Sequence, residues 1–167
     1  IMFVVSPMSP ALGKPAYEQV SLPKDYWSNN GPIKLVAMSP DQGTIAVACA
    51  TGVAVLHRKS EQWTMFTDVR QEAQVRATAL AFVTDRTLLV AAELTHDSDR
   101  HQSKWHEIVL YPSNVLDSTA LLGRYQTSHR VDRVCQQGRW MCVWTINGQL
   151  VLYDIVELNH KIVLEEF

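Results

Sequence analysis

The sequence lacks a marked excess of charge of either sign. Its 167 residues include 15 Lys and Arg against 17 Asp and Glu, which gives a formal net charge of -2. Proteins that bind nucleic acid or anionic membranes through bulk charge carry a clear basic excess, and this chain has none. With 47% apolar and 19% charged residues, the composition still predicts a globular protein with a buried core.

Long apolar runs are also missing. No run approaches the roughly 18 to 20 residues that a membrane-spanning helix needs. The opening IMFVV is too short for a signal peptide and has no cationic region before it. Because the chain begins at Ile1 and stops at Phe167 within the strand-like KIVLEEF, we expect it to be a piece of a longer protein.

Cysteine is scarce, and its spacing does not match a metal site. Cys49, Cys135 and Cys142 are odd in number and lie in apolar, strand-like runs. This pattern favours buried, reduced thiols in a cytosolic protein over a disulfide pair.

Catalytic motifs are absent from the sequence. There is no nucleophile elbow of the Gly-Xaa-Ser-Xaa-Gly type, no phosphate-binding Gly-rich loop and no His-Glu-Xaa-Xaa-His helix. Glu165 and Glu166 are adjacent in a terminal strand, where successive side chains face opposite ways and cannot cooperate. We therefore predict no catalytic residue and no cofactor.

One loop, THDSDRHQSKWH, concentrates polar side chains. His96, Asp97, Asp99, His101 and His106 are of types that could bind a divalent metal, but no short rigid spacing orients them as ligands. The loop is better explained as a lengthened, solvated hairpin connection, and we predict no metal site. Because Trp105 stands beside these charged residues, the loop is a possible partner-binding surface.

Short apolar runs separated by turn residues are what the chain has in abundance. Within 33–66, such runs occupy 33–38, 44–50, 53–57 and 63–66. Pro, Asp and Gly between them supply the backbone angles of tight turns. This segment therefore predicts one four-stranded antiparallel sheet.

The same pattern recurs twice downstream, in 75–126 and in 131–167. The second strands of the three units are expected to begin at Thr44, Thr87 and Trp140. The spacings are thus 43 and 53 residues, and the long loop 95–104 accounts for the surplus in the second. A period of about 40 to 45 residues with four strands indicates the blades of a β-propeller.

Strand interiors such as VAVLH, LLVAA and LVLY are apolar at consecutive positions, so both faces of each sheet should be covered. We predict an all-β fold, a fragment of a WD-type β-propeller with about three four-stranded antiparallel blades plus part of another. The blades are expected at 33–68, 75–126 and 131–167, with 1–32 as the end of a preceding blade or a closing strand. Trp140 and Trp144 share one strand face and are expected in the core.

Several stretches together resemble a known family. They are GPIKLVAMSPDQGTIAVACATGVAVLH, the aromatic strand from Trp63 to Phe66, QEAQVRATALAFVTDRTLLVAAE, EIVLYPSN and LVLYDI. This part of the chain resembles the N-terminal propeller of the ribosome control protein 1 family, the large subunit of a two-subunit guanine-nucleotide exchange factor for Golgi Rab GTPases. The Ser39-Pro40-Asp41 turn is common to WD-type propellers in general.

The resemblance implies a non-catalytic scaffold, peripheral on Golgi membranes, that acts in endosome-to-Golgi and intra-Golgi vesicle traffic. Its implied partners are the second exchange-factor subunit and a Rab GTPase, and it supplies no catalytic residue. One alternative is a WD-type propeller from an unrelated coat, tethering or signalling scaffold. Another is an enzyme whose propeller loops converge on a substrate.

An open propeller fragment should expose the faces of its terminal blades. Three blades and part of a fourth cannot close a ring, because propellers have about four to eight blades. We expect Val53, Val55, Leu150 and Leu152 on those faces, and poor solubility or self-association of the isolated chain.

Overall fold

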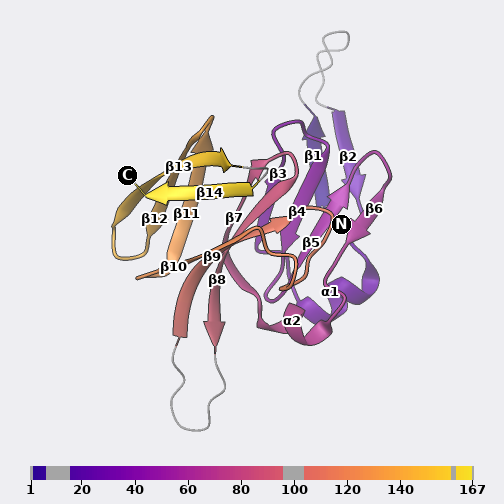
Figure 1. Cartoon of the computed structure of the whole chain (residues 1–167). Coiled ribbons are helices and arrows are strands. Elements are labelled where there is room, and N and C mark those ends of the chain that lie inside the picture. The colour runs from indigo at the N-terminus through magenta and orange to yellow at the C-terminus, as the bar shows by residue number, and fades with distance from the viewer. Residues whose placement is uncertain (1, 7–15, 96–103, 159–160, 167) are drawn as a thin grey trace.

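A computed structural model of the chain describes residues 2–6, 16–95, 104–158 and 161–166. Strands dominate it and form three four-stranded antiparallel sheets and one two-stranded sheet (Figure 1). The predicted all-β class, with three four-stranded units, is confirmed. In each four-stranded sheet, strands that are consecutive in the sequence are neighbours.

The strands have the following bounds. The first sheet contains β3 (Leu35–Met38), β4 (Thr44–Ala48), β5 (Val53–His57) and β6 (Gln62–Thr64). The second contains β7 (Arg76–Thr84), β8 (Thr87–Thr95), β9 (Lys104–Pro112) and β10 (Gly123–Thr127). The third contains β11 (Val131–Gln137), β12 (Trp140–Thr145), β13 (Leu150–Leu158) and β14 (Lys161–Glu166). β1 (Met2–Ser6) pairs with β2 (Ala16–Val20).

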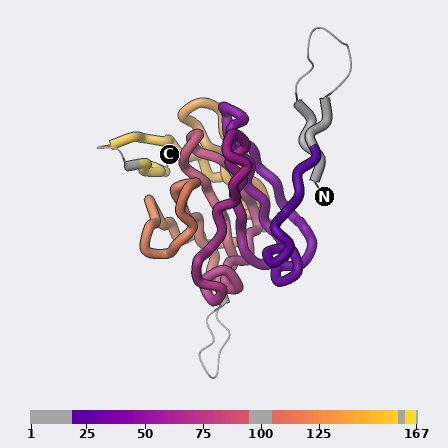
Figure 2. Tube along the Cα trace, turned by 90° about the vertical axis from the view of Figure 1, so that its right-hand side faces the viewer, coloured from indigo at the N-terminus to yellow at the C-terminus, as the bar shows by residue number. Residues whose placement is uncertain are grey.

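The three sheets stack face to face, with the first in front and the third behind in Figure 2. One core joins Ala46, Ala48, Val53 and Val55 of the first sheet to Leu88, Val90, Val109 and Tyr111 of the second. Another joins Leu89, Ala91, Ile108 and Leu110 of the second sheet to Met141, Val143, Tyr153 and Leu164 of the third. Because β8 contributes alternate residues to both cores, its continuous apolar run is explained by burial on two faces.

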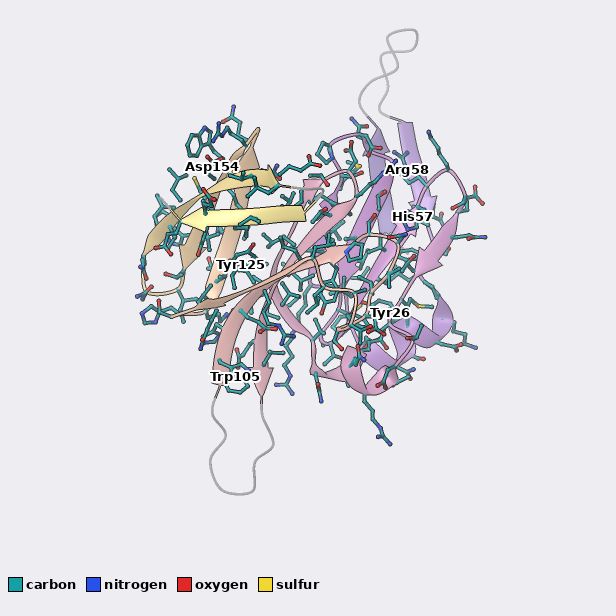
Figure 3. All side chains as sticks on the ribbon, viewed as in Figure 1. Tyr26, His57, Arg58, Trp105, Tyr125 and Asp154 are labelled. Carbon is teal, nitrogen blue, oxygen red and sulfur yellow. The ribbon has the colours of Figure 1, made fainter. Side chains whose placement is uncertain are left out.

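Hydrogen bonds also cross from sheet to sheet. The backbone N–H of Asp41 donates to Oδ1 of Asp85 at 2.8 Å, joining equivalent turns of the first and second sheets. Leu164 donates its N–H to the Tyr125 hydroxyl oxygen at 2.9 Å, between the third and second sheets (Figure 3). These bonds tie neighbouring sheets together in addition to their shared apolar cores.

Two short helices stand where the sequence indicated only connecting segments. α1 (Lys24–Asn30) starts directly after Pro23, and α2 (Val69–Gln74) is capped by Asp68, whose Oδ1 accepts from the Arg70 N–H at 2.8 Å. Tyr26 of α1 is only 2% exposed and packs with buried residues of the first sheet.

The outer face of the first sheet is therefore covered. Ile45, Val47 and Leu56 pack under Val20 of β2, while α1 covers the neighbouring part of that face. Val53 and Val55 are fully buried, because they lie on the opposite face, against the second sheet. The expectation that they would be exposed is wrong.

The fourth strands differ in position from those expected. β6 ends at Thr64 rather than Phe66, and β10 begins only at Gly123 within the expected unit 75–126. A tight turn occupies the segment before β10, where Oδ1 of Asp117 accepts from the Thr119 N–H at 2.7 Å. That turn delays the strand.

Candidate functional site

The first strands of the three sheets lie next to one another. β3 and β7 approach within 8 Å between Cα atoms, as do β7 and β11. Each of them starts at the same end of the molecule, on the side of α1, α2 and the end of β8, which is the lower side of Figure 1. Side chains at the three strand starts therefore converge.

A cation stands at each of these starts. Lys34 immediately precedes β3, Arg76 is the first residue of β7, and Arg130 immediately precedes β11. All three side chains are exposed. The backbone places them firmly, since the Lys34 N–H donates to the Ala48 carbonyl oxygen at 2.8 Å and the Arg130 carbonyl accepts from the Ile146 N–H at 3.0 Å.

These cations line one cavity of about 600 Å³. We call Lys34, Arg76, Arg130 and the carboxylate-bearing Glu93 the basic mouth. Arg76 and Glu93 are directly opposite each other in the β7–β8 ladder. The remaining lining residues are Leu35, Ala50, Thr51, Ala77 and Thr78. Three cations face one carboxylate here, so a chain of slightly negative net charge carries a locally positive site.

The rim of the basic mouth is held by the two helices. The Thr51 hydroxyl donates to Oδ1 of the buried Asn30 at 2.9 Å, and the Gly52 N–H donates to the Val75 carbonyl at 2.8 Å. Gly52 has φ +71°, and a Cβ there would stand 2.7 Å from Cγ of Glu72. Only glycine fits such a position, so the β4–β5 turn is anchored against α1 and α2.

Burial around the rim also shifts ionisation. Desolvation is the main cause that raises the pKa of the Cys49 thiol and of the Tyr26 hydroxyl. The Tyr26 hydroxyl donates to the Val47 carbonyl at 3.3 Å (Figure 3). These groups stay neutral at physiological pH and serve as packing beneath the rim.

Four residues of the predicted partner-binding loop, His96, Asp97, Asp99 and His101, lie outside the described residues. The fifth, Trp105, is on β9 and is 41% exposed. It is opposite Leu94 in the β8–β9 ladder, so it lies on the other face of the sheet from Glu93 but at the same end (Figure 3 labels Trp105). An aromatic side chain and a basic cavity thus share one end of the molecule.

The sequence alone does not predict the basic mouth. The usable signal was a cation at the entrance to the first strand of every unit, at Lys34, Arg76 and Arg130. Lys and Arg are common at strand ends, so this recurrence acquires meaning only once the strand starts are known to be neighbours.

A second exposed surface lies on the third sheet. Met141 and Val143 of β12 point into the core, whereas Trp140 and Trp144 on the other face are 39% and 47% exposed. The expectation that these tryptophans are core residues is wrong, although they do share a face. The second sheet covers the inner face of the third sheet, but no described residues form a comparable layer over this outer face.

The outer face of the third sheet also carries aliphatic and thiol groups. Leu150 is 56% exposed, as expected, and Leu152 is half-buried. Cys135 and Cys142 are direct cross-strand partners, the first exposed and the second half-buried. All three cysteines of the chain are free thiols, but only Cys49 is buried, so the prediction of buried thiols is wrong for Cys135.

An ion pair borders this outer face. Nε of Arg139 donates to Oδ1 of Asp154 at 2.8 Å, a second guanidinium nitrogen contacts Oδ2, and the guanidinium carbon lies 5.3 Å from the centroid of the Trp140 ring. The hydrogen bonds from Arg139 lower the pKa of Asp154. Trp140 is thereby held in place at the edge of the apolar surface.

Among the described residues, no group of three or more His, Cys, Asp or Glu side chains is arranged to hold a metal ion. No helix in the described part of the chain is long and apolar enough to span a membrane. Chemically, the described side chains can bind an anionic group at the basic mouth and an apolar surface at the third sheet.

One protein-family model matches nearly the whole chain. It is described as the RIC1 second beta propeller domain, and it matches residues 2–166, which include all three four-stranded sheets. The family is the one that the sequence resembled, but the matched part is its second propeller rather than the expected N-terminal one. No curated protein matches the chain.

Proposed function

Because the chain belongs to the RIC1 family, we propose that it is a non-catalytic propeller segment of the large subunit of a two-subunit guanine-nucleotide exchange factor for Golgi Rab GTPases. The match over residues 2–166 carries this proposal. An exchange factor opens the nucleotide site of its GTPase through protein contacts, so a scaffold with exposed binding surfaces suits the role. The alternative of an unrelated coat, tethering or signalling scaffold is disfavoured by the same match.

Within this role, the units 33–68, 75–126 and 131–167 act as successive blades, and 1–32 contributes the end of a preceding blade or a closing strand. The partners are the second exchange-factor subunit and a Rab GTPase. The protein works in the cytosol, peripherally on Golgi membranes, in endosome-to-Golgi and intra-Golgi traffic.

We assign partner contact to the end that bears Trp105. Trp105 is exposed at the same end of the molecule as the basic mouth, and aromatic side chains are enriched where proteins bind one another. The loop residues His96, Asp97, Asp99 and His101 are proposed to contribute polar contacts at the same end.

Co-purification tests the proposal. The full-length protein should retain the second subunit and a nucleotide-free Rab, and Trp105→Ala should weaken that retention at least several-fold. Trp27→Ala is the matched control, because Trp27 is also an exposed tryptophan, at 58%, but lies on α1. Consistent absence of both partners from the wild-type preparation would refute the proposed function.

A further inference from the structure

We propose that the basic mouth binds an acidic peptide segment of a partner protein. This deepens the proposed function, because it rests on partner binding at this end of the molecule and names the chemistry that is bound. The first observation is repetition: each of the three stacked sheets places one exposed cation at the start of its first strand, and all three line one cavity. Because the three cations line one cavity, their charges can act together on a single ligand.

The spacing of the cations suits an extended chain. Neighbouring first strands approach within 8 Å between Cα atoms, so successive cations are separated by about the distance between two packed strands. An extended peptide advances roughly 3.3 Å per residue. Side chains two residues apart share one face of such a peptide and are about 6.6 Å apart along it. Carboxylates at every second position can therefore pair with Lys34, Arg76 and Arg130 in turn.

The cavity favours spaced carboxylates over a phosphate group. A phosphate concentrates a charge of about -1.5 to -2 at one point, whereas the mouth offers one cation per sheet and sets Glu93 opposite Arg76. The Glu93 carboxylate repels a phosphate group that would concentrate its negative charge in the cavity. Leu35, Ala50 and Ala77 supply apolar wall that can contact the peptide between its charged residues.

The rim is already ordered in the unbound chain. Thr51 is tied to the buried Asn30, and Gly52 is tied to the end of α2. Binding therefore costs little additional ordering of the protein. The Thr51 and Thr78 hydroxyls already donate within the chain, to Oδ1 of Asn30 and to the Ala91 carbonyl, so the three cations supply the donors for the peptide.

Fluorescence anisotropy tests the inference directly on the 167-residue chain. The probe is a fluorescein-labelled twelve-residue peptide with Glu at every second position and Gly or Ala elsewhere, and the control peptide has Gln in place of each Glu. The test variant is Arg76→Glu with Arg130→Glu. The charge-matched control variant is Lys59→Glu with Arg86→Glu, since both residues are exposed and lie in turns at the opposite end of the sheets.

We expect the Glu peptide to bind, with an affinity that falls as salt is raised, and the mouth variant to bind roughly tenfold or more weakly than wild type. The control variant should bind like wild type, and the Gln peptide should not bind. Should the mouth variant lose its cooperative melt, Arg76→Gln with Arg130→Gln replaces it, with the same expected direction.

Several results would overturn the inference. Equal loss in both charge-reversal variants would mean nonspecific attraction, and equal binding of the Gln peptide would remove the role of charge. Tighter binding of inorganic polyphosphate than of the Glu peptide would make phosphate the ligand. If the peptide fails to bind while the full-length protein still retains its second subunit and Rab, the inference fails and the proposed function stands.

Discussion

The isolated chain should self-associate through the outer face of the third sheet, and substituting Trp144 and Leu150 with Ser should abolish this. Trp140, Trp144 and Leu150 are 39%, 47% and 56% exposed on that face. A tryptophan offers up to about 250 Å². These exposed fractions therefore leave about 100 and 120 Å² on the two rings, worth about 2.5 and 3 kcal/mol at about 25 cal/mol per Å². The exposed half of Leu150 adds about 1 kcal/mol.

Two copies packed through this face would thus gain about 13 kcal/mol, against an association cost of about 4 to 15 kcal/mol. At a cost of about 5 kcal/mol, the remaining 8 kcal/mol corresponds to a dissociation constant of about 1 μM, and at about 9 kcal/mol to one near 1 mM. The double substitution removes about 8 kcal/mol from the pair, which eliminates the surplus.

Light scattering and sedimentation velocity at rising concentration check this prediction. The wild-type chain should grow in apparent mass, and Trp144→Ser with Leu150→Ser should stay monomeric. Trp27→Ser is the control, because Trp27 is as exposed but lies on α1, and it should associate like wild type. A wild-type chain that stays monodisperse and melts cooperatively at several hundred micromolar would refute the reasoning about this face.

Three further predictions concern single residues. Iodoacetamide should label the exposed Cys135 quickly and the buried Cys49 slowly, since burial also raises the pKa of Cys49, and equal rates by mass spectrometry would contradict the packing around α1. Gly52→Ala should lower the free energy of unfolding, measured in denaturant, by about 2 to 4 kcal/mol, because backbone strain at φ +71° is joined by a steric clash with Glu72. Gly138→Ala is the control, since a Cβ there meets no neighbour at φ +60°, and it should lower that free energy by only about 1 to 2 kcal/mol. The pKa of Asp154 is lowered from its ordinary 3.8, so its ion pair with Arg139 stabilises the fold above that pH, and this stability is lost as pH falls through the lowered pKa. Asp154→Asn should therefore lose less stability on acidification than wild type. An unchanged pH profile of unfolding would count against the ion pair.

The strands could be predicted from the sequence because their signals are local. Apolar runs bounded by Pro, Asp and Gly determine where strands begin and turn, and the continuous run in β8 indicates burial on both faces. The helices were missed for an equally physical reason. α1 has 7 residues and α2 has 6, too few to show a helical period, and they are held by packing of Tyr26 and by the Asp68 cap.

The exposed face and the basic mouth could not be predicted because both depend on contacts between units. Val53 and Trp144 each belong to apolar strand runs, yet the first is buried and the second is not, since only the stacking order decides which face receives a neighbour. Likewise, Lys34 and Arg130 are far apart in sequence and come together only through the alignment of β3, β7 and β11.

The most direct test of the account is the release of fluorescent GDP from a Golgi Rab. The full-length protein bound to its second subunit should accelerate release, and the 167-residue chain alone should leave the spontaneous rate unchanged. Acceleration by the isolated chain would contradict its role as a non-catalytic segment. Failure of the complete two-subunit complex to accelerate release from any Golgi Rab would contradict its assignment to an exchange factor.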